Sequence, residues 1–75
     1  MVDKMIEQIL QDNVGKNVRA TLTKCLSTLR NDKEPYNLRV SKCIYDIEKI
    51  LEESNIPSHL RISLMNLLTE LEKLK

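Results

Sequence analysis

The chain of 75 residues contains no tryptophan, no phenylalanine, one glycine and two prolines. So few helix-breaking residues, together with many Leu, Ile, Glu and Lys, favour an all-α fold. A core without these aromatic rings must be filled by Leu, Ile, Val and Met, and such a core is modest. We therefore expect a single domain over residues 1–75, close to the lower size limit for one apolar core, to which a partner subunit would add stability.

An excess of charge of one sign is also missing. Charged residues make up 31% of the chain, yet they nearly cancel to a net charge of +1. Binding a polyanion through bulk charge needs a concentrated excess of Lys and Arg, so the composition argues against that class of protein. No stretch approaches the roughly 18 apolar residues of a membrane span, and the N-terminus lacks the apolar run of a signal peptide. We expect a cytoplasmic protein without a membrane segment.

Residues suited to catalysis or metal binding are scarce as well. His59 is the only histidine, which excludes a catalytic pair of histidines. Cys25 and Cys43 each fall within an amphipathic helical pattern, so we expect buried, reduced thiols rather than nucleophiles or a disulfide. The three residues lack the spacing of a zinc site, and no glycine-rich phosphate loop is present. The sequence predicts no enzyme, no metal and no cofactor.

Apolar residues recur at helical spacing along the whole chain. The clearest stripe runs from Leu60 to Leu74 in steps of four and three. Similar stripes precede it, formed by Val2, Ile6, Ile9 and Leu10, by Val18, Leu22, Cys25 and Leu29, and by Val40, Ile44, Ile47 and Leu51, which Cys43 and Ile50 widen. The stripes predict helices over residues 3–13, 16–31, 35–54 and 57–74.

One pattern, Pro/Gly–x–Asn/His–apolar–Arg–apolar–Ser/Thr, marks each joint between these helices. Its three copies are Gly15–Thr21, Pro35–Ser41 and Pro57–Ser63. Proline suits the first turn of a helix because it needs no donor there, and asparagine near a joint tolerates the left-handed conformation that often ends a helix. Short connections make neighbouring helices antiparallel, so the sequence predicts an up-and-down four-helix bundle.

A repeat of two units lies beneath the three joints. Ile6–Leu10 matches Ile47–Leu51 at an offset of 41 residues, and after one inserted residue the match continues at an offset of 42, as between Arg19 and Arg61. The bundle is therefore expected to consist of two similar helical hairpins. A stack of repeats usually needs at least three units to close its core, so we expect the two hairpins to cover each other.

The chain as a whole resembles uncharacterised protein family 0147, a family of small archaeal proteins. The resemblance rests on Asp12-Asn13-Val14, Asn17-Val18-Arg19, Arg39-Val40, Ile44, the leucine-rich last helix and, most specifically, Ile56-Pro57-x-His59-x-Arg61. This chain has Gly15 where relatives carry proline. The resemblance implies a four-helix bundle and supplies no activity, cofactor or catalytic residue.

The arginines of the three joints, Arg19, Arg39 and Arg61, are the first candidate site. Each stands in about the second turn of a helix, where the helix dipole does not favour a cation, so an acceptor is expected nearby. The guanidinium groups can reach an upstream carboxylate or the unpaired carbonyls of the preceding helix. The alternative is an anion site. Alternating helix direction places Arg19 and Arg61 at one end and Arg39 at the other, which argues against a site built from all three.

His59 occupies the position that Asn17 and Asn37 hold in the other two joints. A residue that exchanges with asparagine is expected to cap a helix or brace a joint rather than to transfer protons. Together with the three arginines it completes a group that is either structural or contacts an anion.

Apolar residues on the outer side of the last two helices are the second candidate site. At 100° per residue, Leu38 and Tyr45 lie opposite the apolar stripe of the third helix, and Ile62 and Met65 lie opposite that of the fourth. They either pack within a wide core or form a contact surface for a homodimer or a protein partner. We expect a non-catalytic interaction or assembly module. The alternative is a nucleic-acid-associated accessory protein that uses basic residues of the second and third helices: Lys16, Arg19, Lys24, Arg30, Lys33, Arg39 and Lys42.

Overall fold

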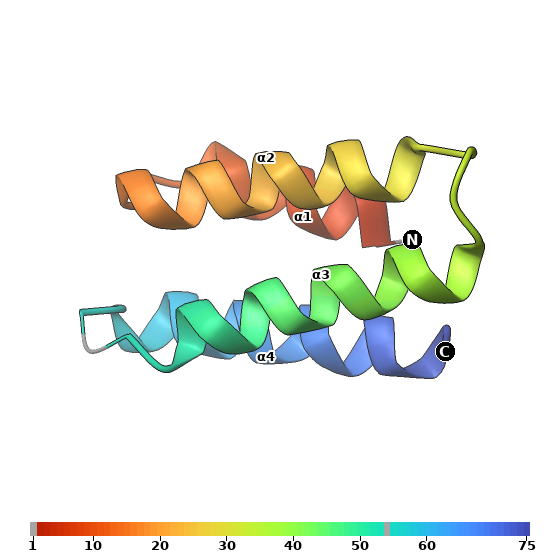
Figure 1. The fold of residues 1–75 in the computed structure, drawn as a ribbon. Coiled ribbons are helices and arrows are strands. Elements are labelled where there is room, and N and C mark those ends of the chain that lie inside the picture. Colours follow the sequence, from red (N-terminus) through yellow and green to blue (C-terminus); the bar gives the residue numbers. More distant parts are fainter. Residues whose placement is uncertain (1, 54) are drawn as a thin grey trace.

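A computed structural model describes residues 2–53 and 55–75, and within them the chain forms helices and no strand. The helices are α1 (Val2–Gln11), α2 (Lys16–Arg30), α3 (Tyr36–Leu51) and α4 (Ser58–Lys73). They run up and down, with the α1–α2 and α3–α4 joints at one end and the α2–α3 joint with both termini at the other (Figure 1). The all-α, antiparallel four-helix arrangement predicted from the sequence is confirmed.

The helix ends differ from the prediction by up to three residues. The third helix was expected over 35–54 but ends at Leu51, since the amide of Glu53 bonds to the carbonyl of Ile50 and so tightens the last turn. Ser54 lies outside the described residues. Pro35 and Pro57 stand before their helices and not within the first turn, because their ψ angles of 144° and 149° are extended. The first helix covers Val2–Gln11, not 3–13, and the other two ends fall one residue early.

The joints turn without a left-handed residue. No residue in 2–53 or 55–75 has a positive φ, so the expected left-handed asparagine is wrong for Asn13, Asn31 and Asn55. The helix ends tighten instead: the amide of Asn31 bonds to the carbonyl of Thr28, and that of Asp12 to the carbonyl of Ile9. A left-handed residue normally brings an N–H to the last carbonyls of a helix. Here other donors must serve these carbonyls.

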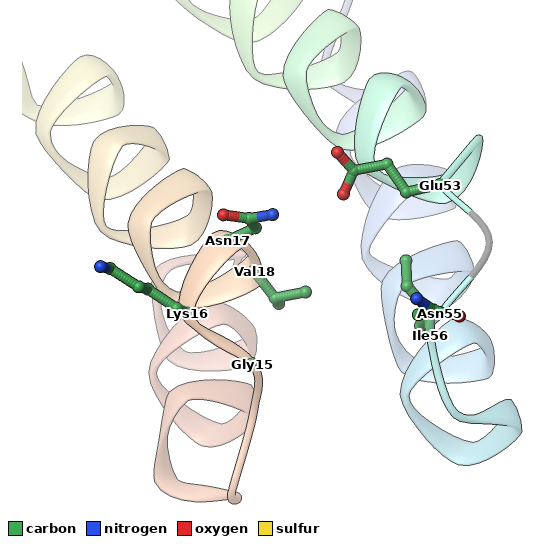
Figure 2. A pocket seen from close by; sticks show the side chains of 7 residues that line it. All are labelled: Gly15, Lys16, Asn17, Val18, Glu53, Asn55 and Ile56. Carbon is green, nitrogen blue, oxygen red and sulfur yellow. The ribbon is translucent and has the colours of Figure 1, made fainter.

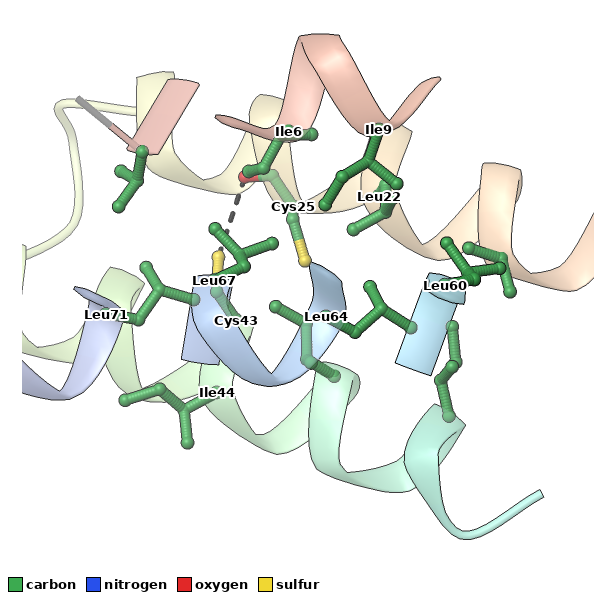
Figure 3. Packing of buried hydrophobic residues seen from close by; sticks show 14 of the residues in the cluster. Ile6, Ile9, Leu22, Cys25, Cys43, Ile44, Leu60, Leu64, Leu67 and Leu71 are labelled. Atoms are coloured by element: carbon green, nitrogen blue, oxygen red, sulfur yellow. Dashed lines mark hydrogen bonds between the residues drawn. The ribbon is translucent and has the colours of Figure 1, made fainter. Parts of the chain in front are cut away.

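The core is a single apolar cluster drawn from all four helices (Figure 3). Its buried members are Val2, Ile6, Ile9, Val14, Val18, Leu22, Cys25, Val40, Cys43, Ile44, Ile47, Ile50, Leu60, Leu64, Leu67 and Leu71. Almost all belong to the predicted stripes, and Leu10, Leu29, Leu51 and Leu74 pack partly buried at the margin. Val14 was not predicted, because it lies in a joint where no helical period applies. No polar side chain of the described residues is buried in this core.

The four helices close a ring. α1 packs on α2 and α4, α3 packs on the same two helices, and the diagonal pairs do not touch. The hairpin α1–α2 therefore covers the hairpin α3–α4, as expected for two units that cannot form an open stack. Two cysteines meet between the hairpins, where Cys43 Sγ donates to the carbonyl oxygen of Cys25 at 3.6 Å (Figure 3). The bundle measures 33 × 19 × 19 Å.

Candidate functional site

The repeated joint pattern places a helix cap and an arginine four residues apart. Gly15, Pro35 and Pro57 are the N-cap residues of α2, α3 and α4. Their carbonyls accept the backbone N–H groups of Arg19, Arg39 and Arg61 at 3.0, 3.1 and 2.9 Å. The first turn of each helix thus fixes where the arginine side chain begins.

Each arginine side chain then reaches back to the end of the preceding helix. Arg19 Nη2 donates to the carbonyls of Leu10 and Asp12 at 3.0 and 3.3 Å. Arg39 Nη1 donates to Leu29 O at 2.7 Å and its Nε to Glu34 O at 3.0 Å.

Arg61 makes the corresponding bonds to Leu51 O at 2.8 Å and Glu53 O at 3.4 Å. Of the acceptors considered from sequence, the arginines take the carbonyls and not the upstream carboxylates. They supply the donors that left-handed cap residues would otherwise bring.

The bonds also follow the internal repeat. Arg19 and Arg61 are 42 residues apart, and the carbonyls that they share, of Leu10 with Leu51 and of Asp12 with Glu53, are 41 apart. This is the change of offset expected from one inserted residue between the acceptors and the donor. The two hairpins therefore build their joints with equivalent contacts.

A pocket of about 380 Å³ lies at the end of the bundle that carries these two joints (Figure 2). Gly15, Lys16, Asn17 and Val18 line one side, and Glu53, Asn55 and Ile56 line the other. Neither Arg19 nor Arg61 lines it, because both guanidinium groups are engaged by carbonyls. The pocket brings together one cation and one carboxylate, which is no basis for an anion site.

His59 takes no part in a cap. It is the second residue of α4, and no side-chain cap bond is made at Pro57. Among the hydrogen bonds of residues 2–53 and 55–75 only its backbone carbonyl appears, accepting from Ser63 Oγ at 3.2 Å. The expectation that this position caps the helix is wrong, because proline fixes the extended residue in front of the helix without a side-chain acceptor. His59 is exposed to solvent.

The two thiols are free and completely buried, as expected. The hydrogen-bonding contact with Cys43 and burial raise the pKa of the Cys25 thiol far above its ordinary value. A thiol held neutral in this way is a poor nucleophile. In the part of the chain that the structure describes, no group of three His, Cys, Asp or Glu side chains could hold a metal ion.

The basic residues proposed for nucleic acid are mostly occupied. Arg30 pairs with Asp3 and Glu7, Lys24 with Asp46, and Lys42 with Glu34. Arg19 and Arg39 bind carbonyls, as described above. A phosphate would therefore compete with intramolecular partners for most of this set.

The outer apolar residues are exposed. Leu38, Tyr45, Ile62 and Met65 expose 44%, 62%, 60% and 54% of their surface. The alternative that they pack within a wide core is therefore wrong. A one-residue ring of core contacts per helix suffices to fill the bundle, which leaves these four on the outer side of α3 and α4.

Sequence reasoning missed one neighbour of this surface. Tyr36, at the start of α3, is 46% exposed, and the guanidinium of Arg39 lies 5.3 Å from its ring centre. Lys49 lies 5.9 Å from the ring of Tyr45 in the same manner. The spacing of three and four residues between aromatic ring and cation was the available signal.

The chain is thus a closed four-helix bundle with apolar residues on the outside of one hairpin and no assembled catalytic group among the described residues. It belongs to the uncharacterised protein family UPF0147, whose pattern matches residues 1–74. A UPF0147 protein of Methanosarcina mazei is 33% identical over 92% of this chain and 75% of its own length. One of Pyrococcus furiosus is 29% identical over the whole chain and 82% of its own length.

The fold also matches a solved structure. The crystal structure of a protein of unknown function, MMP1188, superposes with a TM-score of 0.90 at 29% identity, covering 99% of this chain and 85% of the other. Within the described residues, no helix is long and apolar enough to cross a membrane. The predicted membership of an archaeal family of unknown function is confirmed.

Proposed function

We propose that this protein is a non-catalytic interaction module, acting in the cytoplasm, whose contact surface is the outer side of α3 and α4. The name outer face is used below for Leu38, Tyr45, Ile62 and Met65. One observation carries the proposal. The large apolar side chains that are exposed among the described residues, these four and Tyr36, all belong to α3 and α4.

The physical reason is the cost of leaving such groups in water. An isolated exposed apolar residue is ordinary, but several on one side of a small protein mark a contact surface. Tyrosine and methionine are enriched in protein interfaces. The equivalent positions of Ile62 and Met65 in the first hairpin are Ala20 and Thr23, so the repeat makes the comparison within one molecule.

The test is the double variant Ile62→Asp/Met65→Asp beside wild type. Because both residues are exposed, we expect the variant to fold normally and to lose association, seen as a lower mass in sedimentation or as loss of a protein captured from an extract of the source organism. The matched control Ala20→Asp/Thr23→Asp places the same charges on α2, where both residues are exposed, and should change neither. Equal mass and equal capture for wild type and the outer-face variant would end the proposal.

The nucleic-acid alternative stays a prediction, and no contact described above favours it. A salt-dependent mobility shift with RNA or DNA would support it, and no shift at low salt would remove it.

A further inference from the structure

We propose that the outer face binds a second copy of this chain, in a symmetric dimer in which α3 of each copy lies against α4 of the other. This inference rests on the proposed function for the choice of face. It goes further in naming the partner and the residues that meet.

The first step is the relative height of residues on α3 and α4. α3 ends at Leu51 and α4 begins at Ser58, and the two helices run antiparallel from this joint (Figure 1). Since both helices rise by the same amount per residue, the numbers of two residues at equal height add to about 110. Arg61, whose long side chain reaches toward the joint to bond Leu51 O, agrees with this register.

The register arranges the outer face in three levels. Tyr45 and Met65 share the middle level. Toward the α2–α3 joint, Leu38 on α3 stands level with Glu72 on α4. Toward the α3–α4 joint, Lys49 on α3 stands close to the level of Ile62 on α4, each outer level lying about 10 Å or less from the middle one.

Lys49 and Glu72 share the exposed side with the apolar residues. Lys49 follows Leu38 by eleven residues, and Glu72 follows Met65 by seven, which are three and two helical turns. Both are exposed. Neither belongs to an ion pair among residues 2–53 and 55–75.

A two-fold axis perpendicular to this face exchanges α3 with α4 and one outer level with the other. The residue opposite Leu38 is then Ile62 of the second copy, and the residue opposite Lys49 is Glu72 of the second copy. Both pairs place the axis at the same height, near Cys43 and Ile44. The centre brings the two Tyr45 and Met65 pairs together, and each copy supplies one lysine and one glutamate to the opposite ends.

The size of the face suits such a dimer. The bundle measures 33 × 19 Å along this side, and 33 × 19 gives about 630 Å² before the relief of side chains is added. A standard protein interface buries about 800 Å² on each partner. An isologous contact of this kind also closes on itself, so association stops at two copies.

The experiment is a charge exchange read by sedimentation equilibrium of the full chain. Lys49→Glu and Glu72→Lys each turn two attractive pairs of the dimer into two repulsive ones, so each should raise the dimer dissociation constant by about tenfold. The double variant Lys49→Glu/Glu72→Lys restores both pairs with reversed polarity and should return to within about threefold of wild type. Lys33→Glu, the same charge change in the α2–α3 joint, is the matched control and should leave dimerisation unchanged. Circular dichroism shows that each variant is folded.

Three results would overturn the dimer. They are a wild type that stays monomeric up to about 1 mM, the weakest affinity of interest here, a dimer that Ile62→Asp does not weaken, and a double variant that stays as weak as the single ones. A monomeric wild type that captures another protein through the outer face would end this inference and leave the proposed function standing. Loss of both dimer and capture sensitivity would end both.

Discussion

Replacing Gly15 by proline should stabilise this protein. Gly15 is the N-cap of α2 with φ −65° and ψ 163°, close to the values of Pro35 and Pro57 at the other two joints, −57° and 144°, −58° and 149°. Proline fixes φ near −65°, so the native backbone already has the conformation that the ring requires.

The site also has the room and lacks the bond that proline would remove. A Cβ added at Gly15 meets nothing within 4 Å. Among the backbone hydrogen bonds outside the helices in the described residues, the amide of Gly15 donates none, while its carbonyl accepts from Arg19 and is retained in proline. Val14, the preceding residue, is outside any helix, as a residue before proline should be.

The gain comes from the unfolded chain. Glycine is the most flexible residue and proline the least, so the substitution removes conformations that folding would have to give up. We expect the free energy of unfolding to rise by about 0.4–1 kcal/mol. For a domain of this size that corresponds to a rise in Tm of about 2–8 °C.

The assay is thermal and urea denaturation followed by circular dichroism at fixed protein concentration. Gly15→Ala is the control that separates loss of glycine from gain of the ring and should fall between wild type and Gly15→Pro. Pro35→Gly and Pro57→Gly should each lower stability by a similar amount. A lower Tm for Gly15→Pro would refute the reasoning, because it would mean that the joint does not hold the conformation described here.

The remaining predictions concern the arginines and the buried thiol. Arg39→Met should lower the free energy of unfolding by about 2 kcal/mol, because it leaves two partly buried carbonyl bonds unmade, while Arg19→Met, whose bonds are exposed, should cost less than about 1 kcal/mol; equal losses in urea denaturation would contradict the account. Since the folded-state pKa of Cys25 is raised, its stabilising effect is complete below the unfolded-state pKa of about 8.5 and declines as the pH rises above it, by about 1.4 kcal/mol between roughly pH 7.5 and 9.5. Cys25→Ala should remove that part of the pH dependence, and an unchanged slope would refute the assignment.

Much of the fold was predictable because it depends on local periodicity. The spacing from Leu60 to Leu74 defined both a helix and its buried side, and the structure buries Leu60, Leu64, Leu67 and Leu71 as that spacing requires. The change of repeat offset from 41 to 42 likewise predicted which carbonyls the equivalent arginines would share. These features are set by residues close in the chain.

Helix ends and the burial of Val14 were decided by contacts that no period describes. The sequence pattern suggested left-handed asparagines, and the structure ends its helices with arginines that donate to Leu10, Leu29 and Leu51 carbonyls. An arginine can do this only when the next helix has turned back beside the last one. The choice between carboxylate and carbonyl therefore belongs to the packing.

The sequence by itself determined that this protein is a bundle of two helical hairpins, because amphipathic period and short joints leave few other arrangements. It also placed Leu38, Tyr45, Ile62 and Met65 opposite the apolar stripes. Only the tertiary structure decided that these four are exposed, because a helix side that faces away from its own stripe can still be covered by a neighbouring helix. The ring of four helices covers one side of each, and the outer face remains in contact with solvent.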